Sequence, residues 1–309
     1  MKILIAHDTY YPDVNGAAYF TFRLAKYLKK AGHEILVIAP SMTRKSYYSV
    51  YEGINEFRVW SLPAMVVEDF RFCLPIGIKR KISKAIVKFN PDVIHVQGHF
   101  PLDRAVVSIA KKKKIPLVGT NHFMPDNLSH YIPLPRKAVK KLESLAWKDC
   151  KRVFEKMDVI TTPTKTAADL LYKIGIKKTV HPISCGIDFT KYGVGKADLS
   201  LKKKYKIPNK PVLLFVGRVD KEKNIDVVLK ALPKVLKKCD LQFVVIGKGA
   251  KMKNLKVLAE GLEVEKNVTF TGFMPNEDLP KFIPLADCFV LACAVELQSI
   301  ATMEAMLSG

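Results

Sequence analysis

Short apolar runs that alternate with amphipathic helical segments constrain the fold of this chain more than any other feature. The apolar runs of the first part lie at residues 2–7, 34–40, 92–97, 115–122 and 158–164. The helical segments between them span residues 19–30, 79–89, 103–114 and 147–156. Short strands that alternate with helices are typical of a parallel sheet covered on both faces. The pattern therefore predicts a doubly wound α/β fold.

The alternation stops between residues 187 and 209, where the sequence is polar and contains two glycines. It then resumes with apolar runs at residues 211–218, 241–247, 267–272 and 288–293. A chain of 309 residues is long enough for two domains of about 100–200 residues each. We therefore predict two Rossmann-like domains, residues 1–190 and residues 191–309.

The net charge is strongly positive, at +22, from 51 lysines and arginines against 29 acidic residues. Such an excess suits an anionic partner, although lysine-rich proteins whose charges are simply solvated show it too. The basic runs Lys111–Lys114 and Lys202–Lys204 contain no interleaved aromatic residues, so nucleic acid is not the expected partner. An anionic membrane surface and a phosphorylated substrate remain as alternatives.

No apolar run approaches the roughly 18–20 residues needed to span a bilayer, and the first run is too short for a secretory signal. We therefore expect a cytoplasmic protein. Its six cysteines form no CxxC pair and lie at no zinc spacing from a histidine. Mostly buried free thiols are expected rather than a metal site.

Two strand-end loops of the first part carry weak signals, in the position where ligands of such sheets bind. Asn15-Gly16 suits a backbone of positive φ before a helix that begins near Ala17, which favours a phosphate cradle of backbone amides. His122 ends another strand, where a neutral imidazole can hydrogen-bond a sugar hydroxyl or a leaving phosphate. An Asn-Gly turn and a lone histidine are each more often structural.

The loop GRVDKEKN at residues 217–224 is a more specific signal. Gly217 lets the chain turn sharply at the end of a strand, and Arg218 and Lys223 place two cations where a helix begins near Asn224. Arginine offers a planar fork to phosphate oxygens, lysine adds a point charge, and the helix start adds backbone amides. Together they predict a diphosphate site.

Gly247 and Gly249 follow the next apolar run of the second part. The third glycine of a dinucleotide-binding motif is missing, because Met252 stands in its place, so a nicotinamide fold is not expected. We interpret the two glycines as allowing a ligand to approach this loop closely.

Glu296 and Glu304 are eight residues apart in ELQSIATME. A continuous helix would separate them by about 12 Å and rotate them by about 80° relative to each other. We therefore expect Glu296 in a loop and a helix that begins near Ser299. In that arrangement the two carboxylates can reach the two ends of one elongated ligand.

Together these motifs resemble retaining glycosyltransferases of family four, which have the GT-B fold of two Rossmann-like domains facing a central cleft. The matching segments are LAKYLKKAGHEILVIAP, PISCGIDF, GRVDKEKN, FTGFMPNEDLP and ELQSIATMEAM. The last of these looks like the family's pair of glutamates separated by seven residues. The resemblance extends over nearly the whole chain.

The resemblance implies a role for each matching residue. Arg218 and Lys223 would hold the diphosphate of a nucleotide sugar and stabilise its charge as it leaves. Glu296 and His122 would contact the donor sugar, and these four residues form the candidate catalytic set. The other implied donor contacts are Gly16 at the phosphates, Gly272, Phe273 and Met274 at the base, Glu304 at the ribose, and Gly217, Ser299 and Ile300.

The implied activity is transfer of a hexose from a UDP- or GDP-linked donor, with no metal and no cofactor. Basic amphipathic segments at residues 79–89 and 136–151 favour a lipid acceptor such as diacylglycerol or a phospholipid, and peripheral attachment to the inner face of the cell membrane. The family continues well beyond its second glutamate, so we expect the second domain to be incomplete. The alternative is a catalytically impaired nucleotide-sugar-binding fragment that needs a partner chain for the missing segment.

Overall fold

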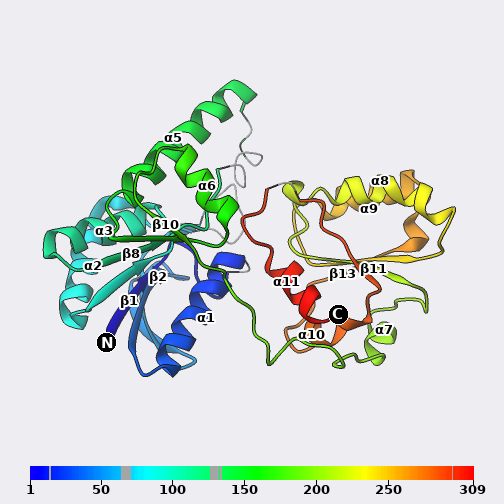
Figure 1. Cartoon of the computed structure of the whole chain (residues 1–309), viewed down its shortest axis with the longest axis horizontal. Coiled ribbons are helices and arrows are strands. Elements are labelled where there is room, and N and C mark those ends of the chain that lie inside the picture. The colour runs from blue at the N-terminus through cyan, green and yellow to red at the C-terminus, as the bar shows by residue number, and fades with distance from the viewer. Residues whose placement is uncertain (14, 64–70, 126–131, 133, 294) are drawn as a thin grey trace. The chain divides into compact units, whose positions relative to one another are not determined.

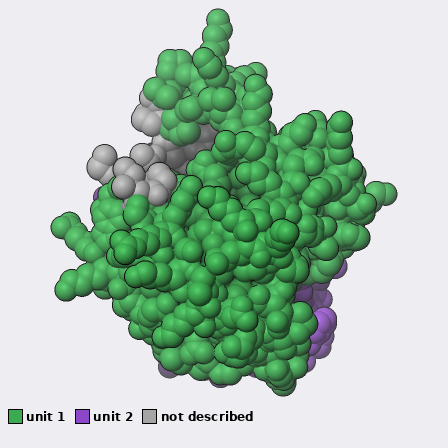
Figure 2. All heavy atoms as spheres, turned by 90° about the vertical axis from the view of Figure 1, so that its left-hand side faces the viewer, with its two compact units in different colours: residues 1–185 green, residues 186–309 purple. Residues whose placement is uncertain are grey.

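The structure, a computed structural model, describes all residues except 14, 64–70, 126–131, 133 and 294. The chain divides into two compact units, Met1–Cys185 and Gly186–Gly309. Figure 1 shows the elements of the two units, and Figure 2 colours the units separately. Each unit has its own sheet and its own hydrophobic core.

An eight-stranded sheet forms the centre of unit 1, in the order β10-β9-β8-β7-β1-β2-β4-β3. Its strands are β1 (Lys2–Ala6), β2 (Glu34–Pro40), β3 (Tyr47–Tyr51), β4 (Ile54–Val59), β7 (Val93–Val96), β8 (Leu117–Thr120), β9 (Val159–Thr162) and β10 (Val180–Pro182). Neighbouring strands are parallel except for the edge pair of β3 and β4. A separate antiparallel pair consists of β5 (Leu62–Pro63) and β6 (Arg71–Phe72). The predicted parallel α/β sheet is confirmed, with an antiparallel edge strand that the alternation did not predict.

Helices connect the strands of unit 1. They are α1 (Gly16–Lys30), α2 (Pro75–Phe89), α3 (Pro101–Lys113), α5 (Arg136–Phe154) and α6 (Lys165–Lys173). The sequence indicated a basic amphipathic segment over residues 136–151 and a helix over residues 147–156, and the structure joins them in one helix that begins at Arg136. Its buried residues are Cys150, Val153 and Phe154, all in its last turns. The earlier turns of α5 therefore contribute no buried side chain to the core.

The central strand β1 is buried on both faces. Ile5 packs with Phe22 of α1 on one face of the sheet. Leu4 points to the other face and packs in a cluster with Ile82 of α2 and Val106 of α3. A strand covered on both sides explains why its sequence is a continuous apolar run rather than an alternation of apolar and polar residues.

A parallel four-stranded sheet forms the centre of unit 2, in the order β13-β12-β11-β14. Its strands are β11 (Val212–Val216), β12 (Gln242–Ile246), β13 (Val268–Gly272) and β14 (Cys288–Phe289). Its helices are α7 (Ser200–Lys204), α8 (Ile225–Leu236), α9 (Met252–Gly261), α10 (Leu279–Phe282) and α11 (Ile300–Leu307), with the 3-10 turns η1 (Lys221–Lys223), η2 (Glu265–Asn267) and η3 (Ile283–Leu285). The second doubly wound α/β unit is thus confirmed.

The two faces of the unit 2 sheet are also covered separately. Phe215 of β11 packs with Leu229 of α8 and Leu255 of α9. Leu214 packs on the other face in a cluster that includes Leu201 of α7. The segment around α7, which looked like a polar connection in the sequence, therefore supplies part of the unit 2 core.

Gly247 and Gly249 let the loop after β12 pack directly against the loop after β11. A Cβ on Gly247 would overlap the carbonyl oxygen of Gly217, and one on Gly249 would overlap that of Val219. A backbone hydrogen bond of 2.8 Å from Val219 N to Lys248 O joins the same two loops. The space beside these glycines is thus occupied by a neighbouring loop, which accounts for both glycines without a ligand.

Replacing Gly247 or Gly249 with alanine should destabilise unit 2 by roughly 1–3 kcal/mol, because the added methyl group must displace packed backbone. Gly247 also has a φ of 139°, which an alanine adopts only under strain. The matched control is Gly261→Ala at the end of α9, where a Cβ would meet no atom within 4 Å. Urea unfolding measures all three variants. Equal stability of all three would contradict the prediction.

Candidate functional site

Arg218 lies in the loop that leaves β11, and two acidic side chains hold it there. Its Nη1 donates to Asp220 Oδ2 at 3.0 Å, and its Nη2 donates to Glu222 Oε1 at 2.7 Å. The two carboxylate side chains are only 7% and 2% exposed, whereas that of Arg218 is 38% exposed. Asp220 also accepts from Ala250 N at 2.9 Å, which ties the arginine to the loop after β12. The guanidinium is thus fixed at the strand end while remaining accessible to an anion.

Asp220 and Glu222 were missed in the sequence, although both stand inside the motif GRVDKEKN. Their signal is their spacing, two and four residues after Arg218. In a tight turn that leads into a helix, such residues can fold back onto the arginine, as they do here.

Lys223 ends the turn η1 and pairs with Glu296 from the loop after β14. Its Nζ lies 2.6 Å from Glu296 Oε2 and 3.9 Å from Cys293 Sγ. The next residue, Asn224, has a left-handed backbone with φ of 50° and donates from Nδ2 to Ala292 O at 3.1 Å. The structure therefore brings both predicted cations and the first glutamate to the carboxyl edge of the unit 2 sheet.

The segment that carries both glutamates is a loop followed by a helix. Glu296 precedes the helix, and α11 begins at Ile300 with Ser299 as its N-cap, whose Oγ accepts from Thr302 N at 3.1 Å. Glu304 lies inside α11. The predicted helix start is confirmed. The binding roles of Ser299, Ile300, Glu296 and Glu304 stay predictions.

Gly272 ends β13, and the two residues that follow it differ in what they offer to a ligand. The side chain of Met274 is buried in the unit 2 core, at 3% exposure. Phe273 is 48% exposed. Of these predicted base contacts, Phe273 presents a side chain to solvent, whereas Met274 can contribute only through its backbone.

In unit 1, the first loop ends in a side-chain cap on α1. Asn15 Oδ1 accepts from Ala18 N at 2.9 Å, and Asn15 Nδ2 donates to Thr9 Oγ1 at 2.6 Å. The φ of Asn15 is −148°, so the expectation of a positive φ there is wrong: the residue is an extended N-cap. Gly16 is the first residue of α1, whose first turn carries no acidic residue. The amides of this helix start suit an anion.

A buried arginine holds the same loop from β4. Arg58 Nη2 donates to Tyr11 O at 2.7 Å, and its guanidinium lies 4.9 Å from the ring centre of Tyr10. Arg58 Nε donates to Glu56 Oε2 at 2.9 Å, and these two side chains are only 6% and 3% exposed. The sequence signal was a pair of opposite charges two residues apart in the strand INEFRV, which places both on one face.

His122 lies two residues beyond the end of β8 and is largely enclosed. Its Nε2 lies 3.0 Å from Gln97 Oε1, and its ring centre lies 4.7 Å from that of Phe20. Burial, with a smaller contribution from His95, lowers the pKa of His122 to about 3. The imidazole is therefore neutral at physiological pH.

The predicted site residues divide between the two units. Gly16 and His122 belong to unit 1, whereas the diphosphate residues and both glutamates belong to unit 2. Within each unit they lie at the carboxyl ends of parallel strands, the edge at which doubly wound sheets bind ligands.

A pair of buried carboxyl groups, Asp8 and Asp103, lies at the same edge of unit 1. Asp8 follows β1 and accepts from Leu102 N and Asp103 N at the start of α3, both at 3.1 Å. No donor among the described residues reaches either oxygen of Asp103, and its carboxyl group interacts with that of Asp8. Burial and the charge of Asp8 raise the pKa of Asp103 well above its usual range. Burial also raises the pKa of Asp8 to about 6.

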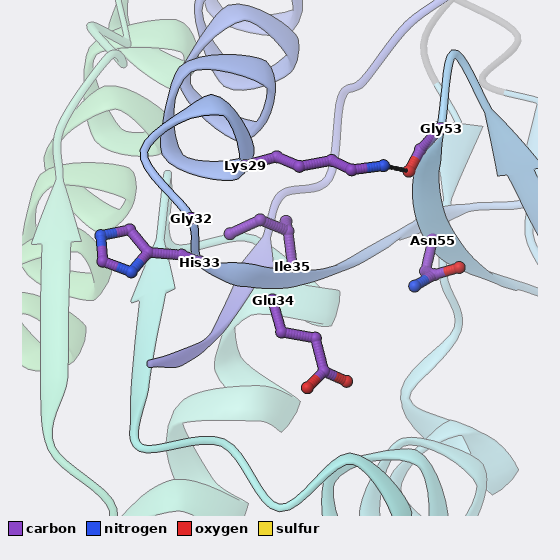
Figure 3. A pocket seen from close by; sticks show the side chains of 7 residues that line it. All are labelled: Lys29, Gly32, His33, Glu34, Ile35, Gly53 and Asn55. Atoms are coloured by element: carbon purple, nitrogen blue, oxygen red, sulfur yellow. Dashed lines mark hydrogen bonds between the residues drawn. The ribbon is translucent and has the colours of Figure 1, made fainter.

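A hollow of about 370 Å³ in unit 1 lies away from these loops. Glu34 begins β2 and lines it, so the hollow opens at the amino ends of the strands. Figure 3 shows Lys29 reaching across to the carbonyl oxygen of Gly53. We assign no function to this hollow, because ligands of such sheets bind at the opposite edge.

Among the described residues, no helix is long and apolar enough to cross a membrane, and no three His, Cys, Asp or Glu side chains gather as metal ligands. All six cysteines are free. Cys73 and Cys150 are buried, but Cys239 and Cys288 are exposed, so the expectation of mostly buried thiols is wrong.

Two Rossmann-like units, each with a parallel sheet, are the components of the GT-B fold of glycosyltransferases. Residues 14–191 match Glycosyltransferase Family 4, and residues 198–309 match Glycosyl transferases group 1. The chain belongs to glycosyltransferase family 4.

Named relatives agree with this assignment. The chain is 31% identical to an alpha-monoglucosyldiacylglycerol synthase of Streptococcus pneumoniae, over all of this chain and 70% of the relative. It is 27% identical to a GDP-mannose-dependent alpha-mannosyltransferase of Corynebacterium glutamicum, over all of this chain and 71% of that relative. The fold is similar to that of Anabaena HepE in complex with UDP-glucose, with a TM-score of 0.75 and 16% identity over 99% of this chain and 78% of that one. The resemblance to family four is thus confirmed, and the chain is a glycosyltransferase.

The buried carboxyl pair predicts an unusual dependence of stability on pH. Because both pKa values are raised in the folded protein, unfolding releases protons. The free energy of unfolding therefore falls as pH rises. The fall begins near pH 4, the ordinary pKa of an aspartate, and continues to and beyond pH 6, the approximate pKa of Asp8 in the folded protein. Asp103→Asn removes one of the two groups and keeps a donor for Asp8. The variant should therefore gain stability relative to the wild type between pH 5 and pH 8, by roughly 1–2 kcal/mol.

Urea unfolding at both pH values measures this gain. Asp226→Asn on the surface of α8 is the control and should leave the pH profile unchanged. A parallel pH profile for Asp103→Asn and the wild type would show that Asp103 does not hold the proton.

Proposed function

We propose that unit 2 binds the diphosphate of a nucleotide sugar and that the chain transfers the sugar to an acceptor with retention of configuration. The observation that carries the proposal is the position of Arg218 and Lys223, both held at one strand end just before α8. Backbone amides of a helix start and two side-chain cations are suited to a diphosphate. The C. glutamicum relative is described as GDP-mannose-dependent, and the HepE structure is a complex with UDP-glucose.

The chemistry follows from where charge develops. Cleavage of the bond between the anomeric carbon and the phosphate oxygen leaves negative charge on the diphosphate, which Arg218 and Lys223 stabilise in place of a metal. The acceptor hydroxyl attacks the same face of the sugar, and its proton passes to the leaving phosphate oxygen. In this proposal Glu296 accepts hydrogen bonds from the sugar hydroxyls, and His122 contacts the sugar as a neutral imidazole.

Removing either cation should weaken donor binding. Arg218→Ala and Lys223→Met should each lower the affinity for the preferred donor by at least roughly tenfold, because each removes charge-assisted hydrogen bonds to phosphate. Isothermal titration with UDP-, GDP- and ADP-linked sugars identifies the donor and measures the loss. Lys230→Met is the matched control, since Lys230 is a partly exposed lysine of α8 that pairs with Asp226 at 2.7 Å. Unchanged affinity in both site variants would overturn the assignment of the diphosphate site.

Binding alone does not make the chain a catalyst. Release of labelled sugar to water or to an acceptor distinguishes a transferase from a protein that only holds the nucleotide sugar. Binding without any turnover would favour the alternative of an impaired fragment that needs a partner chain.

For the acceptor we propose a membrane lipid. The S. pneumoniae relative is described as a monoglucosyldiacylglycerol synthase. Helix α5 carries basic residues over most of its length, and its apolar side chains Leu142 and Leu145 are 40% and 51% exposed. These two leucines are three residues apart and share one helix face. A cationic helix with exposed leucines can attach to an anionic lipid surface, which also suits the net charge of +22.

The lipid proposal predicts salt-sensitive binding to anionic vesicles. The double variant Leu142→Ser/Leu145→Ser should bind vesicles of phosphatidylglycerol roughly tenfold more weakly than the wild type, because two apolar side chains no longer enter the lipid. Co-sedimentation at low and high salt measures this. The control is Val257→Ser, which alters a valine of α9 that is 66% exposed in unit 2. Absence of wild-type binding at low salt would contradict membrane attachment.

A further inference from the structure

Three carboxylates contact the two cations of the donor site, so the cluster as it stands is not positively charged. Asp220 and Glu222 are almost fully buried and belong to the same short loop as the arginine that they hold. Glu296 is different, because it comes from the loop after β14 and its side chain is 31% exposed. Of the three, Glu296 is the carboxylate best able to exchange its partner.

Glu296 is paired with the ammonium group of Lys223, the same group that the proposed donor site offers to a phosphate. Their charged atoms are 2.6 Å apart, a full charge-assisted hydrogen bond, and the side chain of Lys223 is only 15% exposed. A phosphate that binds this ammonium group brings a second negative charge close to Glu296. Like charges that share one cation in a partly dry site repel each other, so binding requires the carboxylate to turn away or to find a new donor.

We infer that Glu296 selects the sugar-bearing nucleotide over the sugar-free nucleoside diphosphate, by competing with the diphosphate for Lys223. The inference rests on the proposed donor site. An attached sugar supplies hydroxyl groups that donate to Glu296, so the carboxylate exchanges one donor for another as Lys223 turns to the phosphate. A nucleoside diphosphate lacks these hydroxyl groups and leaves Glu296 beside the phosphate without a new partner. Glu296 therefore weakens the binding of the product more than that of the donor.

The same competition assists the end of the reaction. When the sugar moves to the acceptor, Glu296 loses its hydroxyl donors and returns to Lys223. The returning carboxylate takes the place of the phosphate oxygens, and the nucleoside diphosphate leaves. Glu296 thus sets specificity by placing its negative charge beside Lys223, and this role is separate from its contact with the sugar.

The test is the affinity of Glu296→Gln for two ligands, the preferred nucleotide sugar and its nucleoside diphosphate, each by isothermal titration. The glutamine keeps the size of the side chain and removes its charge. The variant should bind the nucleoside diphosphate roughly threefold to tenfold more tightly than the wild type and should bind the nucleotide sugar no more tightly. A residue that only contacts sugar would leave the affinity for the diphosphate unchanged.

Two further variants separate this local effect from other causes. Asp240→Asn changes the net charge by the same amount just before β12, at the opposite edge of the sheet, and its partner Lys210 is not part of the site. It should leave both affinities unchanged. Glu296→Asp keeps the negative charge and should keep the affinity for the nucleoside diphosphate closer to that of the wild type than Glu296→Gln does.

The inference is overturned if the wild type binds both ligands and Glu296→Gln binds the nucleoside diphosphate equally well or more weakly than the wild type. That result leaves the donor site standing. Equal gains in Glu296→Gln and Asp240→Asn overturn it as well, because the cause is then overall charge. If the folded wild type binds neither nucleotide, the donor site itself is overturned, and the inference with it.

Discussion

Backbone hydrogen bonds between neighbouring strand-end loops hold the carboxyl edge of unit 2. The candidate residues for binding the nucleotide sugar lie on these loops, so their positions depend on those bonds. Gly217 N donates to Ile246 O at 3.0 Å, and Gly247 N donates to Gly272 O at 2.8 Å. These bonds require close contact of main chains, which the glycines allow. The long side chain of Arg218 is then oriented by carboxylates that are fixed to the same framework.

Unit 1 stabilises its own strand-end loops through buried charged groups. Arg58 holds the first loop through a carbonyl group and an aromatic ring, and Asp8 caps the start of α3. Each group is satisfied by specific partners, since a buried charge without them is costly. Removing one partner of such a pair leaves the other unsatisfied. The loops of unit 1 are therefore expected to be rigid where these contacts are made.

The sequence predicted the features that depend on local pattern. Continuous apolar runs such as residues 2–7 mark strands covered on both faces, and the start of α11 follows from Ser299 and the spacing of the glutamates. Features that depend on distant neighbours could not be predicted. The role of Gly249 is set by a loop about 30 residues earlier, and that of Asp103 by Asp8, which lies 95 residues earlier.

The candidate site shows the same limit. The motif GRVDKEKN indicated Arg218 and Lys223 because cations before a helix are a local signal. The pairing of Lys223 with Glu296 was not predicted, because the two residues are 73 positions apart along the chain. The partners of Arg218, Asp220 and Glu222, were missed although their spacing is local. A pattern of residue types predicts which groups a site contains. It does not predict how those groups neutralise one another before a ligand arrives.

The strand order of unit 2 also bears on how the chain folds as it is synthesised. The strand β11 lies between β12 and β14, but β14 follows it by more than 70 residues. During synthesis from the amino terminus, β11 and β12 can pair early, while the other edge of β11 waits for residues 288 and 289. An apolar strand with one open edge is exposed to wrong pairing during that interval. Unit 1 has completed its sheet by residue 182, before any strand of unit 2 exists.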